Sequence, residues 1–463
     1  MAEDDRGQGW GGRLPLERGQ GPAADVPAAL RVFARRSTSL APRVVILGGG
    51  FGGVTTALEL ARRCAGILPV DVTLVSDRNF FLFTPMLAEA ATGAVETRHV
   101  LHPIRPLCTA AGVEFGEMSV EEIDLGRRRI RGRHSRSLVR QEVHYDRLVL
   151  ALGAAPNLAM ADGAAEHALT FKGAGDAVQI RNRVIDLFEA AALIDDPWVR
   201  RRLLTFVVVG AGHAGTELVA ALEELTRGIL LRHYPSIPPA EVRLVLVGSA
   251  VLPQTARSLA AYAREQLLER GIQLEASRAA AVSADGLRLQ DGRLIESRCV
   301  IWTAGNRVSP VVEALPVPKA KDGRLLVSEF FEVQGAPGVY ALGDNAAQSD
   351  VHTGQPYVAT AQVALRQGRA LGAQLEAELV GRERRPFRFQ LLGEMAPLSR
   401  RTAVADLKGW KLTGFPAWLL WKTVYMLKLP TLATRVRVVL DWTVELFFER
   451  DVSELNVDAA RGA

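Results

Sequence analysis

The feature that most constrains this chain is a strand, a glycine-rich turn and a helix that follow one another twice. The first copy spans residues 43–64, and the second spans residues 206–231. The glycines that define the two turns are Gly48, Gly50 and Gly53 in the first copy and Gly210, Gly212 and Gly215 in the second. Each strand is a run of β-branched and other apolar residues, which is typical of a strand buried in a parallel sheet.

A second apolar strand follows each helix, at residues 70–75 in the first copy and 242–247 in the second. Each copy is therefore a β-α-β unit whose first turn reads G-x-G-x-x-G. Glycine permits the tight turn and lets the backbone approach a pyrophosphate, to which the helix N-terminus offers free N–H groups. One such turn is weak evidence, because glycine-rich turns are common. Two such turns, each between a predicted strand and a helix, predict an α/β fold with two Rossmann-like dinucleotide-binding domains.

Three more apolar strands end in small residues, within residues 148–153, 300–305 and 338–344. Glycine at the end of a strand often marks a place where the backbone passes close to a ligand. The residues concerned are Ala151, Gly153, Ala304, Gly305, Gly343 and Asp344. A Gly-Asp pair alone is a common turn. After two dinucleotide motifs, we interpret it as part of a site for FAD, near the ribityl chain and the pyrophosphate.

The bulk properties exclude several classes of protein. The chain of 463 residues is long enough for two or three domains, and its 48% apolar and 23% charged residues are ordinary for a globular protein. A net charge of +5 is too weak to argue for nucleic acid. Residues 1–42 lack the apolar stretch of a signal peptide and are predicted to form a disordered tail. Because no uncharged apolar run reaches 18 residues, no membrane-spanning helix is expected.

Cysteine usage narrows the chemistry. Cys64, Cys108 and Cys299 are far apart and form no C-x-x-C pair, so neither a disulfide framework nor a metal site is expected, and a location on the cytosolic side is the plain interpretation. A disulfide reductase and a sulfide:quinone oxidoreductase both need paired reactive cysteines, so both are disfavoured. A soluble ferredoxin reductase would leave the aromatic C-terminal segment unexplained.

Together with several other segments, these motifs resemble the type II NADH dehydrogenases, which are single-subunit, non-pumping NADH:quinone oxidoreductases. The similarity covers residues 43–455. Besides the glycine turns and the Gly-Asp pair, the segments that carry it are Asp77-Arg78-Asn79-Phe80-Phe81-Leu82-Phe83-Thr84-Pro85-Met86-Leu87, Trp302-Thr303-Ala304-Gly305, Ala361-Gln362-Val363-Ala364, Gly414-Phe415-Pro416-Ala417-Trp418 and Asp441-Trp442. The Ala-Gln-x-Ala segment discriminates best, because the family is similar there in the wall that faces the quinone.

The resemblance implies that different segments of the chain bind FAD, NAD(P)H and a membrane surface. Residues 43–165 and 300–390 would form a discontinuous FAD-binding domain, and residues 166–299 would form the NAD(P)H-binding domain. Residues 391–463 would form an amphipathic helical region that binds a membrane surface. Hydride would pass from NADH to FAD, and two electrons would then pass to a membrane quinone. The protein would lie peripherally on the cytoplasmic side of the cell membrane, and a homodimer is left open.

The resemblance also assigns roles to single residues. Glu217 would lie near the nicotinamide and the flavin, and Gln362 would lie by the flavin pyrimidine edge and the quinone head group. Thr84 and Pro85 would line the isoalloxazine. The plainer alternative for Glu217 is a carboxylate at the start of a helix, stabilised by the helix dipole. For Gln362 it is a polar residue that begins a helix, and for Thr84 and Pro85 it is an extended turn. The remaining predicted cofactor contacts are Phe51, Gly52, Ser76, Asp77, Arg78, His213, Ala214, Gly248 and Ala361.

Three positions depart from the expected pattern. The Asp or Glu that usually ends the second strand and binds the ribose hydroxyls is Ser76 in the first unit and Gly248 in the second. This leaves NADPH open, with Arg257 as a candidate phosphate partner although no arginine follows at once, and NADH stays the expected electron donor. A glutamate introduced at Gly248 should favour NADH. The missing acid also keeps open a flavin-binding sensor without quinone turnover. The second glutamine of the family's A-Q-x-A-x-Q pattern is Arg366, with Gln367 beside it.

The C-terminal stretch predicts two helices on a membrane surface. The first, residues 415–430, is too short to span a bilayer and mixes leucines with aromatic and basic residues that suit the headgroup level. Those residues are Trp418, Trp421, Lys422, Tyr425 and Lys428. The second helix begins near Arg435 and carries one polar stripe on an otherwise apolar surface. That stripe comprises Arg437, Asp441, Glu445 and Glu449. The plainer alternative is that both helices are core or a dimer interface.

Overall fold

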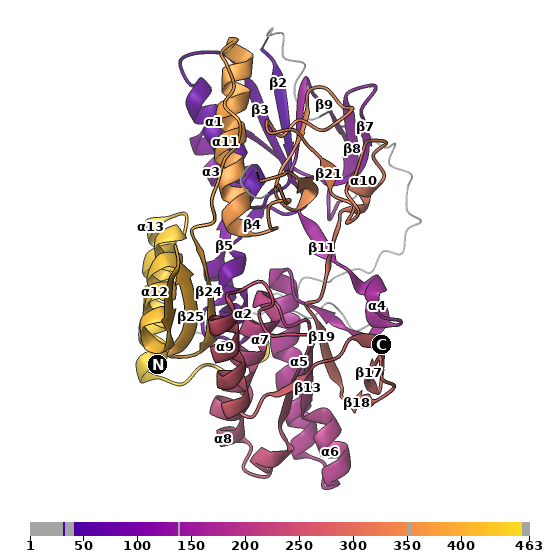
Figure 1. The fold of residues 1–463 in the computed structure, drawn as a ribbon, viewed down its shortest axis with the longest axis vertical. Coiled ribbons are helices and arrows are strands. Elements are labelled where there is room, and N and C mark those ends of the chain that lie inside the picture. The colour runs from indigo at the N-terminus through magenta and orange to yellow at the C-terminus, as the bar shows by residue number, and fades with distance from the viewer. Residues whose placement is uncertain (1–30, 33–40, 138, 351–353, 456–463) are drawn as a thin grey trace, which may run out of the picture.

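The computed structural model describes residues 31–32, 41–137, 139–350 and 354–455. Two α/β bodies lie end to end along the long axis, and the C-terminal region forms a further layer beside their junction (Figure 1). Most of the tail predicted over residues 1–42 falls outside the described residues. Within it, β1 (Arg31–Val32) pairs in parallel with β9 (Arg140–His144), so the expectation of disorder is wrong for these two residues.

The first body is built on a five-stranded parallel sheet in the order β22-β10-β2-β3-β6. These strands are β2 (Arg43–Leu47), β3 (Asp71–Ser76), β6 (Glu114–Glu117), β10 (Arg147–Leu150) and β22 (Val339–Ala341). Helices α1 (Phe51–Cys64) and α11 (Ala361–Val380) pack against each other beside the sheet. Because β22 and α11 come from far along the chain, the body is discontinuous, as predicted.

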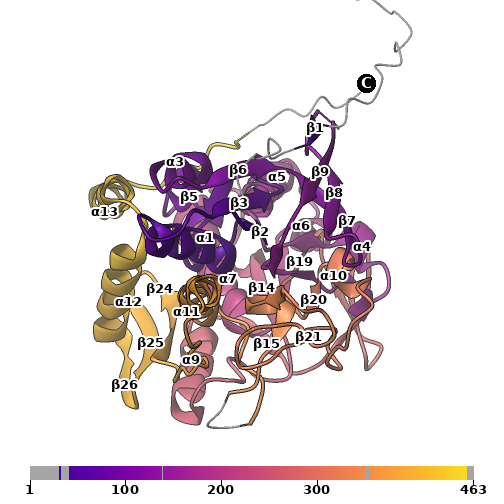
Figure 2. The same cartoon turned by 90° about the horizontal axis from the view of Figure 1, so that it is seen from above.

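Shorter elements complete the first body. They are β4 (Phe80–Leu82), η1 (Thr84–Met86), α2 (Leu87–Ala91), η2 (Thr97–Val100), β5 (Leu101–Pro103), α3 (Ile104–Ala110), β7 (Ser119–Asp124), β8 (Arg129–Arg133), α10 (Pro310–Glu313), β21 (Leu325–Leu326), η6 (Gly343–Asn345) and β23 (Ala346–Ala347). Strands β7, β8 and β9 form an antiparallel sheet on the side of the molecule away from the C-terminal layer (Figure 2).

The second body has its own parallel sheet in the order β12-β19-β13-β14-β15. These strands are β12 (Leu169–Thr170), β13 (Thr205–Val209), β14 (Arg243–Val247), β15 (Gln273–Glu275) and β19 (Cys299–Trp302). The helices are α4 (Ala164–His167), α5 (Ala174–Ala192), α6 (Pro197–Leu203), α7 (His213–Glu223), the π-helical η4 (Glu224–Leu230), α8 (Leu231–His233) and α9 (Arg257–Glu269). The other elements are η3 (Leu158–Met160), η5 (Pro239–Glu241), β16 (Ala279–Ser283), β17 (Gly286–Leu289) and β18 (Leu294–Glu296).

The predicted boundaries at residues 165 and 300 both differ from the observed ones. Ala161 and Ala164 already pack with the second sheet, so the second body begins before residue 165. Strand β19 pairs with β13 along its whole length, so residues 300–302 belong to the second sheet and not to the first body. The chain crosses between the bodies at β11 (Ala154–Pro156) and β20 (Asn306–Val308), which pair antiparallel with each other. The two glycine turns therefore lie on separate sheets that are joined by one short ribbon (Figure 1).

The C-terminal region contains a sheet that the sequence did not predict. Strands β24 (Gly393–Ser399), β25 (Thr402–Leu407) and β26 (Trp410–Thr413) are antiparallel. Strand β24 has no β-branched residue and contains a proline, which hides it from pattern analysis. The predicted helices follow as α12 (Gly414–Lys428) and α13 (Leu432–Phe447). In the described part of the chain, every helix is too short or too polar to cross a membrane.

Candidate functional site

The three glycines of the first turn are needed for different reasons. Gly48 has φ +118°, and a Cβ on it would lie 2.0 Å from the carbonyl oxygen of Ala151. A Cβ on Gly53 would lie 2.0 Å from the carbonyl oxygen of Gly48. Gly50 has φ −88° and ψ −170°, which any residue adopts, and a Cβ there would meet no described atom within 4 Å. Close contacts within the protein require glycine at positions 48 and 53, whereas no such contact requires it at position 50.

Gly50 lines a cavity of about 490 Å³ in the first body. The predicted cofactor contacts that line the same cavity are Gly48, Phe51, Gly52, Ser76, Asp77, Arg78, Thr84, Ala151, Gly153, Gly343, Asp344 and Ala361. The N-terminus of α1 opens into the cavity, which directs its free N–H groups at a bound phosphate. The volume is within the range of cofactor pockets. The cavity, the helix end and the unhindered glycine together fit FAD.

Two residues of this site were not predicted from the sequence. Lys172 lines the cavity from the start of the second body, and its Nζ lies 3.7 Å from Oδ2 of Asp344. The buried Gln367 accepts a hydrogen bond from the backbone N–H of Gly343 at 2.8 Å, which fixes the turn that carries Asp344. A glutamine on an otherwise apolar helical face was the available signal for Gln367. No local pattern places Lys172 beside Asp344.

Three predicted residues lie outside the cavity wall. Gly53 packs behind the turn, and Pro85 lies within η1 next to the lining residue Thr84. Gln362 follows the lining residue Ala361 on α11, and its Oε1 accepts a hydrogen bond from the backbone N–H of Leu392 at 3.1 Å. The structure therefore places Gln362 where α11 meets the segment that leads into the C-terminal sheet.

The three glycines of the second turn have the same steric surroundings as those of the first. Gly210 has φ +111°, and a Cβ on it would lie 2.6 Å from Oγ1 of Thr303. A Cβ on Gly215 would lie 1.8 Å from the carbonyl oxygen of Gly210. Gly212, with φ −75° and ψ −172°, would place a Cβ at least 4 Å from every described atom. No close contact requires glycine at this position, so the second turn leaves the same open space at the start of α7 that the first turn leaves at the start of α1.

The other residues predicted for the second site surround this turn. His213 and Ala214 begin α7, and Ala304 with Gly305 follows β19. Burial lowers the pKa of His213, whereas Glu394, 3.8 Å away, opposes that shift. The backbone N–H of Gly248, just after β14, donates to the carbonyl oxygen of Glu275 at 3.0 Å.

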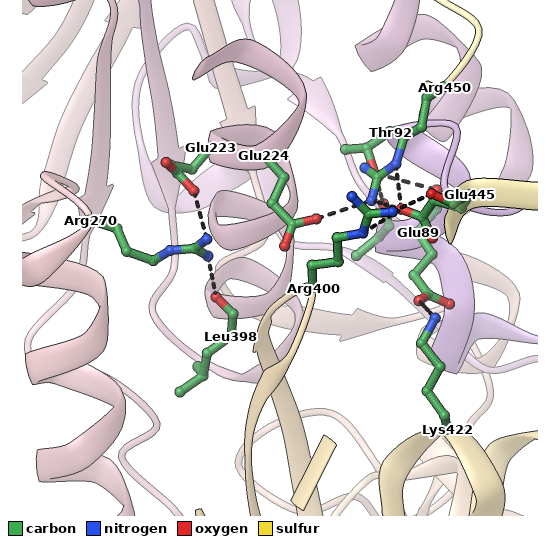
Figure 3. Close-up of polar contacts among 11 residues, drawn as sticks. Glu89, Thr92, Glu223, Glu224, Arg270, Leu398, Arg400, Lys422, Glu445 and Arg450 are labelled. Carbon is green, nitrogen blue, oxygen red and sulfur yellow. Dashed lines mark hydrogen bonds and ion pairs between the residues drawn. The ribbon is translucent and has the colours of Figure 1, made fainter. Parts of the chain in front are cut away.

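A cluster of charged side chains joins both bodies to the C-terminal region (Figure 3). We call it the junction cluster, and it comprises Glu89, Glu224, Lys422, Glu445 and Arg450. Lys422 pairs with Glu89 at 3.2 Å and lies 4.0 Å from the ring centre of Trp442. Lys422 is therefore buried, and the expectation that it reaches lipid phosphates is wrong. Trp421 is buried as well and cannot lie at the headgroup level.

Glu217 lies on α7 beside the junction cluster, where its carboxyl lines a small cavity with Glu89 and Lys422. Burial raises the pKa of Glu217 well above its usual value, and the charge of Glu89 adds to this. Burial raises the pKa of Tyr425, and the charge of Glu217 adds to this; the ring centre of Tyr425 lies 6.1 Å from that of Phe83. Because Phe83 contacts the lining residue Phe51, Glu217 lies behind an aromatic wall of the FAD cavity.

Part of the predicted polar stripe on α13 faces the protein, and the apolar remainder of the helix is largely exposed. Asp441 pairs with His99 at 2.6 Å and Glu445 pairs with Arg450, so much of the polar stripe faces the protein. Arg437 and Glu449 are exposed. The large apolar side chains exposed on α12, α13 and the residues beside them are Trp410, Phe415, Leu419, Leu427, Leu432, Val436, Val439, Leu440, Val444, Leu446, Phe447 and Phe448.

Fold and site define a flavoprotein with two dinucleotide domains, and the family comparison agrees. Residues 42–368 match the pyridine nucleotide-disulphide oxidoreductase family, and residues 391–451 match the NDH2 C-terminal domain. The chain is 32% identical to the type II NADH:quinone oxidoreductase Ndh of Mycobacterium tuberculosis, with 88% of this chain and 89% of the relative covered. The chain belongs to the type II NADH:quinone oxidoreductase family.

Other relatives are consistent with this assignment. The demethylphylloquinone reductase NdbB of Synechocystis is 31% identical over 88% of this chain and 96% of its own. Among solved structures, NDH2 of Plasmodium falciparum in complex with NADH gives a TM-score of 0.83 at 19% identity, covering 89% of this chain and 99% of that one. At this identity the structural likeness establishes the fold alone.

Proposed function

We propose that this chain transfers a hydride from NADH to FAD and then passes two electrons to a quinone. The observation that carries the proposal is that Gly50, which no close contact within the protein requires, lines a cavity of about 490 Å³ at the start of α1, and that Gly212 holds the equivalent open position in the second turn. The chain belongs to the type II NADH:quinone oxidoreductase family and has two candidate nucleotide sites, one on each sheet. This arrangement suits electron transfer between two cofactors. Bound FAD supplies an acceptor for the hydride and a donor of two electrons.

The first body would hold FAD and the second would hold NADH. The N–H groups at the start of α1 and the turn at Gly50 would bind the FAD pyrophosphate, while Lys172 and Asp344 would position its remainder. The start of α7 and the turn at Gly212 would bind the nicotinamide dinucleotide. Relative to the expectation from sequence, the domain boundary moves to the end of β19 at Trp302.

The overall reaction consumes one proton, because NADH and a quinone yield NAD⁺ and a quinol only with an additional H⁺. Glu217 is suited to hold that proton, since its raised pKa keeps the carboxyl protonated above the usual range for glutamate. The Lys422–Glu89 pair beside it would tune how readily the proton is released. Gln362 would position the quinone where α11 meets the C-terminal region.

The C-terminal helices would anchor the protein peripherally to a membrane, where a hydrophobic quinone dissolves. Asp441 and Glu445 of α13 form contacts within the protein, and most of its outer face is apolar apart from the exposed Arg437, with Val436 51% exposed and Phe447 77% exposed. Such a patch is costly in water and typical of a membrane or protein contact. The three free cysteines are compatible with the cytoplasmic face, a reducing compartment.

Anaerobic flavin spectroscopy tests the electron transfer. FAD-loaded protein should bleach when NADH is added and recover its colour when a short-chain quinone follows. Gln362→Leu should slow the recovery more than the bleaching, because its position is on the quinone side. A yellow protein that no nicotinamide bleaches would instead support a flavin-binding sensor.

Vesicle flotation tests the anchor. The double change Leu440→Glu and Val444→Glu places charge on the outer face of α13, while Leu193→Glu changes an apolar residue that is 87% exposed on the second body. The double variant should no longer float with vesicles, and the control should still float. If the wild type never floats but the double variant changes a dimer to a monomer, the face is an interface between copies.

A further inference from the structure

The C-terminal region contacts the second glycine turn as well as the outer surface. Strand β24 packs against α7, the helix that follows this turn. His213 is the first residue of α7, directly after Gly212, and Glu394 is the second residue of β24. Their side chains meet, with Nε2 of His213 3.8 Å from Oε2 of Glu394. A carboxylate from outside the two α/β bodies therefore lies beside the turn that would bind the nicotinamide dinucleotide.

Glu394 is held in place by its neighbours. Oγ1 of Thr255, in the loop before α9, donates a hydrogen bond to Oε2 of Glu394 at 2.9 Å. The preceding Gly393 has φ +146°, and a Cβ on it would lie 1.9 Å from the carbonyl oxygen of Asp406. Strand β24 thus begins in close contact with β25. The backbone before Glu394 and its carboxylate are both fixed, which keeps the carboxylate beside His213.

The imidazole of His213 is available to a ligand. Its side chain is 36% exposed, and neither ring nitrogen forms a hydrogen bond with another residue in the described part of the chain. Burial lowers the pKa of His213, and the charge of Glu394 opposes that shift. The imidazole is therefore mainly neutral in the free protein at neutral pH, with one anion already beside it.

A dinucleotide would bring a second anion to this position. The start of α7 offers free N–H groups to the pyrophosphate of NADH, and His213 is the first side chain of that helix. The positive end of the helix disfavours a protonated imidazole until an anion is bound there. An anion within about 4–6 Å favours the protonated form, which can donate to a phosphate oxygen. With Glu394 on one side and the pyrophosphate on the other, His213 would be protonated in the complex.

The other charged residues on α7 and on the elements packed against it are engaged elsewhere. Three of the carboxylates pair with basic side chains, Arg227 donates to backbone carbonyl oxygens, and Arg243 begins β14 at the end away from the turn. Glu217 lies one turn further along α7. Of all these groups, Glu394 is the one whose charge acts on the pKa of His213. The paired carboxylates are Glu89 with Lys422, Glu223 with Arg270 and Glu224 with Arg450.

We propose that Glu394 holds His213 in position, and in its protonated form, to bind the pyrophosphate of the nicotinamide dinucleotide. The inference rests on the proposed function, because it concerns the dinucleotide that reduces the flavin. His213 takes up a proton from solvent as the dinucleotide binds, and it donates to a phosphate oxygen. Glu394 is a positioning residue, since it acts through His213, and Thr255 fixes its carboxylate. The C-terminal region thereby contributes to cofactor binding as well as to the proposed membrane contact.

Calorimetry with ADP-ribose tests the proposal on the full-length, FAD-loaded protein. ADP-ribose contains the same pyrophosphate diester, which stays ionised throughout, and it cannot reduce the flavin. Titrations in two buffers that differ in ionisation enthalpy measure the protons taken up on binding. The wild type should take up a proton near neutral pH and should bind more weakly as the pH rises, because a neutral His213 must then be protonated.

Three variants and a control identify the groups responsible. Glu394→Gln should bind ADP-ribose about threefold to tenfold more weakly at neutral pH, since a change of one pKa unit in His213 corresponds to a factor of ten. His213→Gln should take up no proton. Thr255→Val, which frees the carboxylate without removing it, should weaken binding by about threefold. Glu265→Gln, an exposed carboxylate on α9, should match the wild type, and flavin content confirms that each variant is folded.

A double variant separates positioning from support of the fold. In a His213→Gln background, Glu394→Gln should no longer weaken ADP-ribose binding, because Glu394 acts through the imidazole. Equal weakening in both backgrounds would show that Glu394 only supports the fold and would overturn the inference. In flavin bleaching, Glu394→Gln should raise the KM for NADH and leave the rate at saturation within about twofold of the wild type.

The same measurements distinguish the two levels of the argument. ADP-ribose binding without proton uptake, in a wild type whose flavin NADH still bleaches, would overturn the inference and leave the proposed function intact. A wild type that does not bind ADP-ribose and that NADH does not bleach would overturn the proposed function itself.

Discussion

The two β-α-β units share a backbone plan and differ in what surrounds it. In both, close backbone contacts require the outer glycines of the turn, whereas the middle glycine has open space around it. Helix α1 packs against α11 of its own body, whereas α7 packs against α2 and against strand β24 of the C-terminal region. Two residues after the last glycine, the first unit has Thr55 and the second has Glu217. The shared geometry binds dinucleotides, and the differing neighbours determine which chemistry each unit supports.

The largest effect should come from the last glycine of each turn. In Gly53→Ala and Gly215→Ala the new Cβ would overlap a backbone carbonyl, so each should lower the free energy of unfolding by about 2–4 kcal/mol. Gly53→Ala should also lose flavin, and Gly215→Ala should remain yellow but resist reduction by NADH. Denaturant unfolding and flavin content per chain measure both. Ordinary stability in either variant would contradict the assigned turn geometry.

Substitutions of the middle glycines should weaken cofactor binding and leave the stability of the protein nearly unchanged. Gly50→Val and Gly212→Val introduce side chains into open space, so flavin-free protein should unfold within about 0.5 kcal/mol of the flavin-free wild type. Gly50→Val should bind FAD at least about a hundredfold more weakly, and Gly212→Val should lose NADH reduction to a similar extent. Equilibrium flavin titration and bleaching rates provide the measurements. A yellow, stoichiometric Gly50→Val protein would show that the first cavity is not the FAD site.

Glu217 and Thr55 occupy equivalent positions in the two units, and the pH dependence of stability tests how they differ. The folded pKa of Glu217 lies above its unfolded value, so the folded state loses stability as the pH rises from about 4 through the folded pKa. Glu217→Gln cannot ionise, and it should be more stable than the wild type by about 1–2 kcal/mol at neutral pH, with no difference near pH 4.

The same variant should slow quinone reduction by about tenfold or more, because the carboxyl proton is gone. Thr55→Val in the first unit is the matched control and should show no change in the pH dependence of stability. If Glu217→Gln tracks the wild type at every pH, the carboxyl is ionised normally and cannot store the proton.

The smallest effect should come from the strand end of the first unit. Ser76 lines the FAD cavity and accepts a hydrogen bond from the backbone N–H of Arg78 at 3.3 Å. Ser76→Ala keeps the Cβ and removes the hydroxyl, so FAD should bind about threefold to tenfold more weakly, the cost of one neutral hydrogen bond. A larger loss, measured by flavin titration, would mean that Ser76 carries more of the ribose recognition than its partner position in the second unit.

The sequence alone determined the features that depend on local pattern. Strand, glycine turn and helix follow one another within about 20 residues, so the backbone requirements of Gly48 and Gly210 can be read directly from residue type and spacing. Most of the cavity wall was predicted for the same reason, since it consists of strand ends and turns. The two C-terminal helices were also predictable, because their apolar content and length are local properties.

Only the tertiary structure decided which distant residues meet. An amphipathic pattern divides a helix into two faces, but packing determines which face is covered, and Asp441 of α13 is turned inward by His99. Lys422 is buried because Glu89, more than 300 residues earlier, lies beside it. Lys172 reaches Asp344 because the two bodies pack against each other, which brings residues far apart in the sequence together.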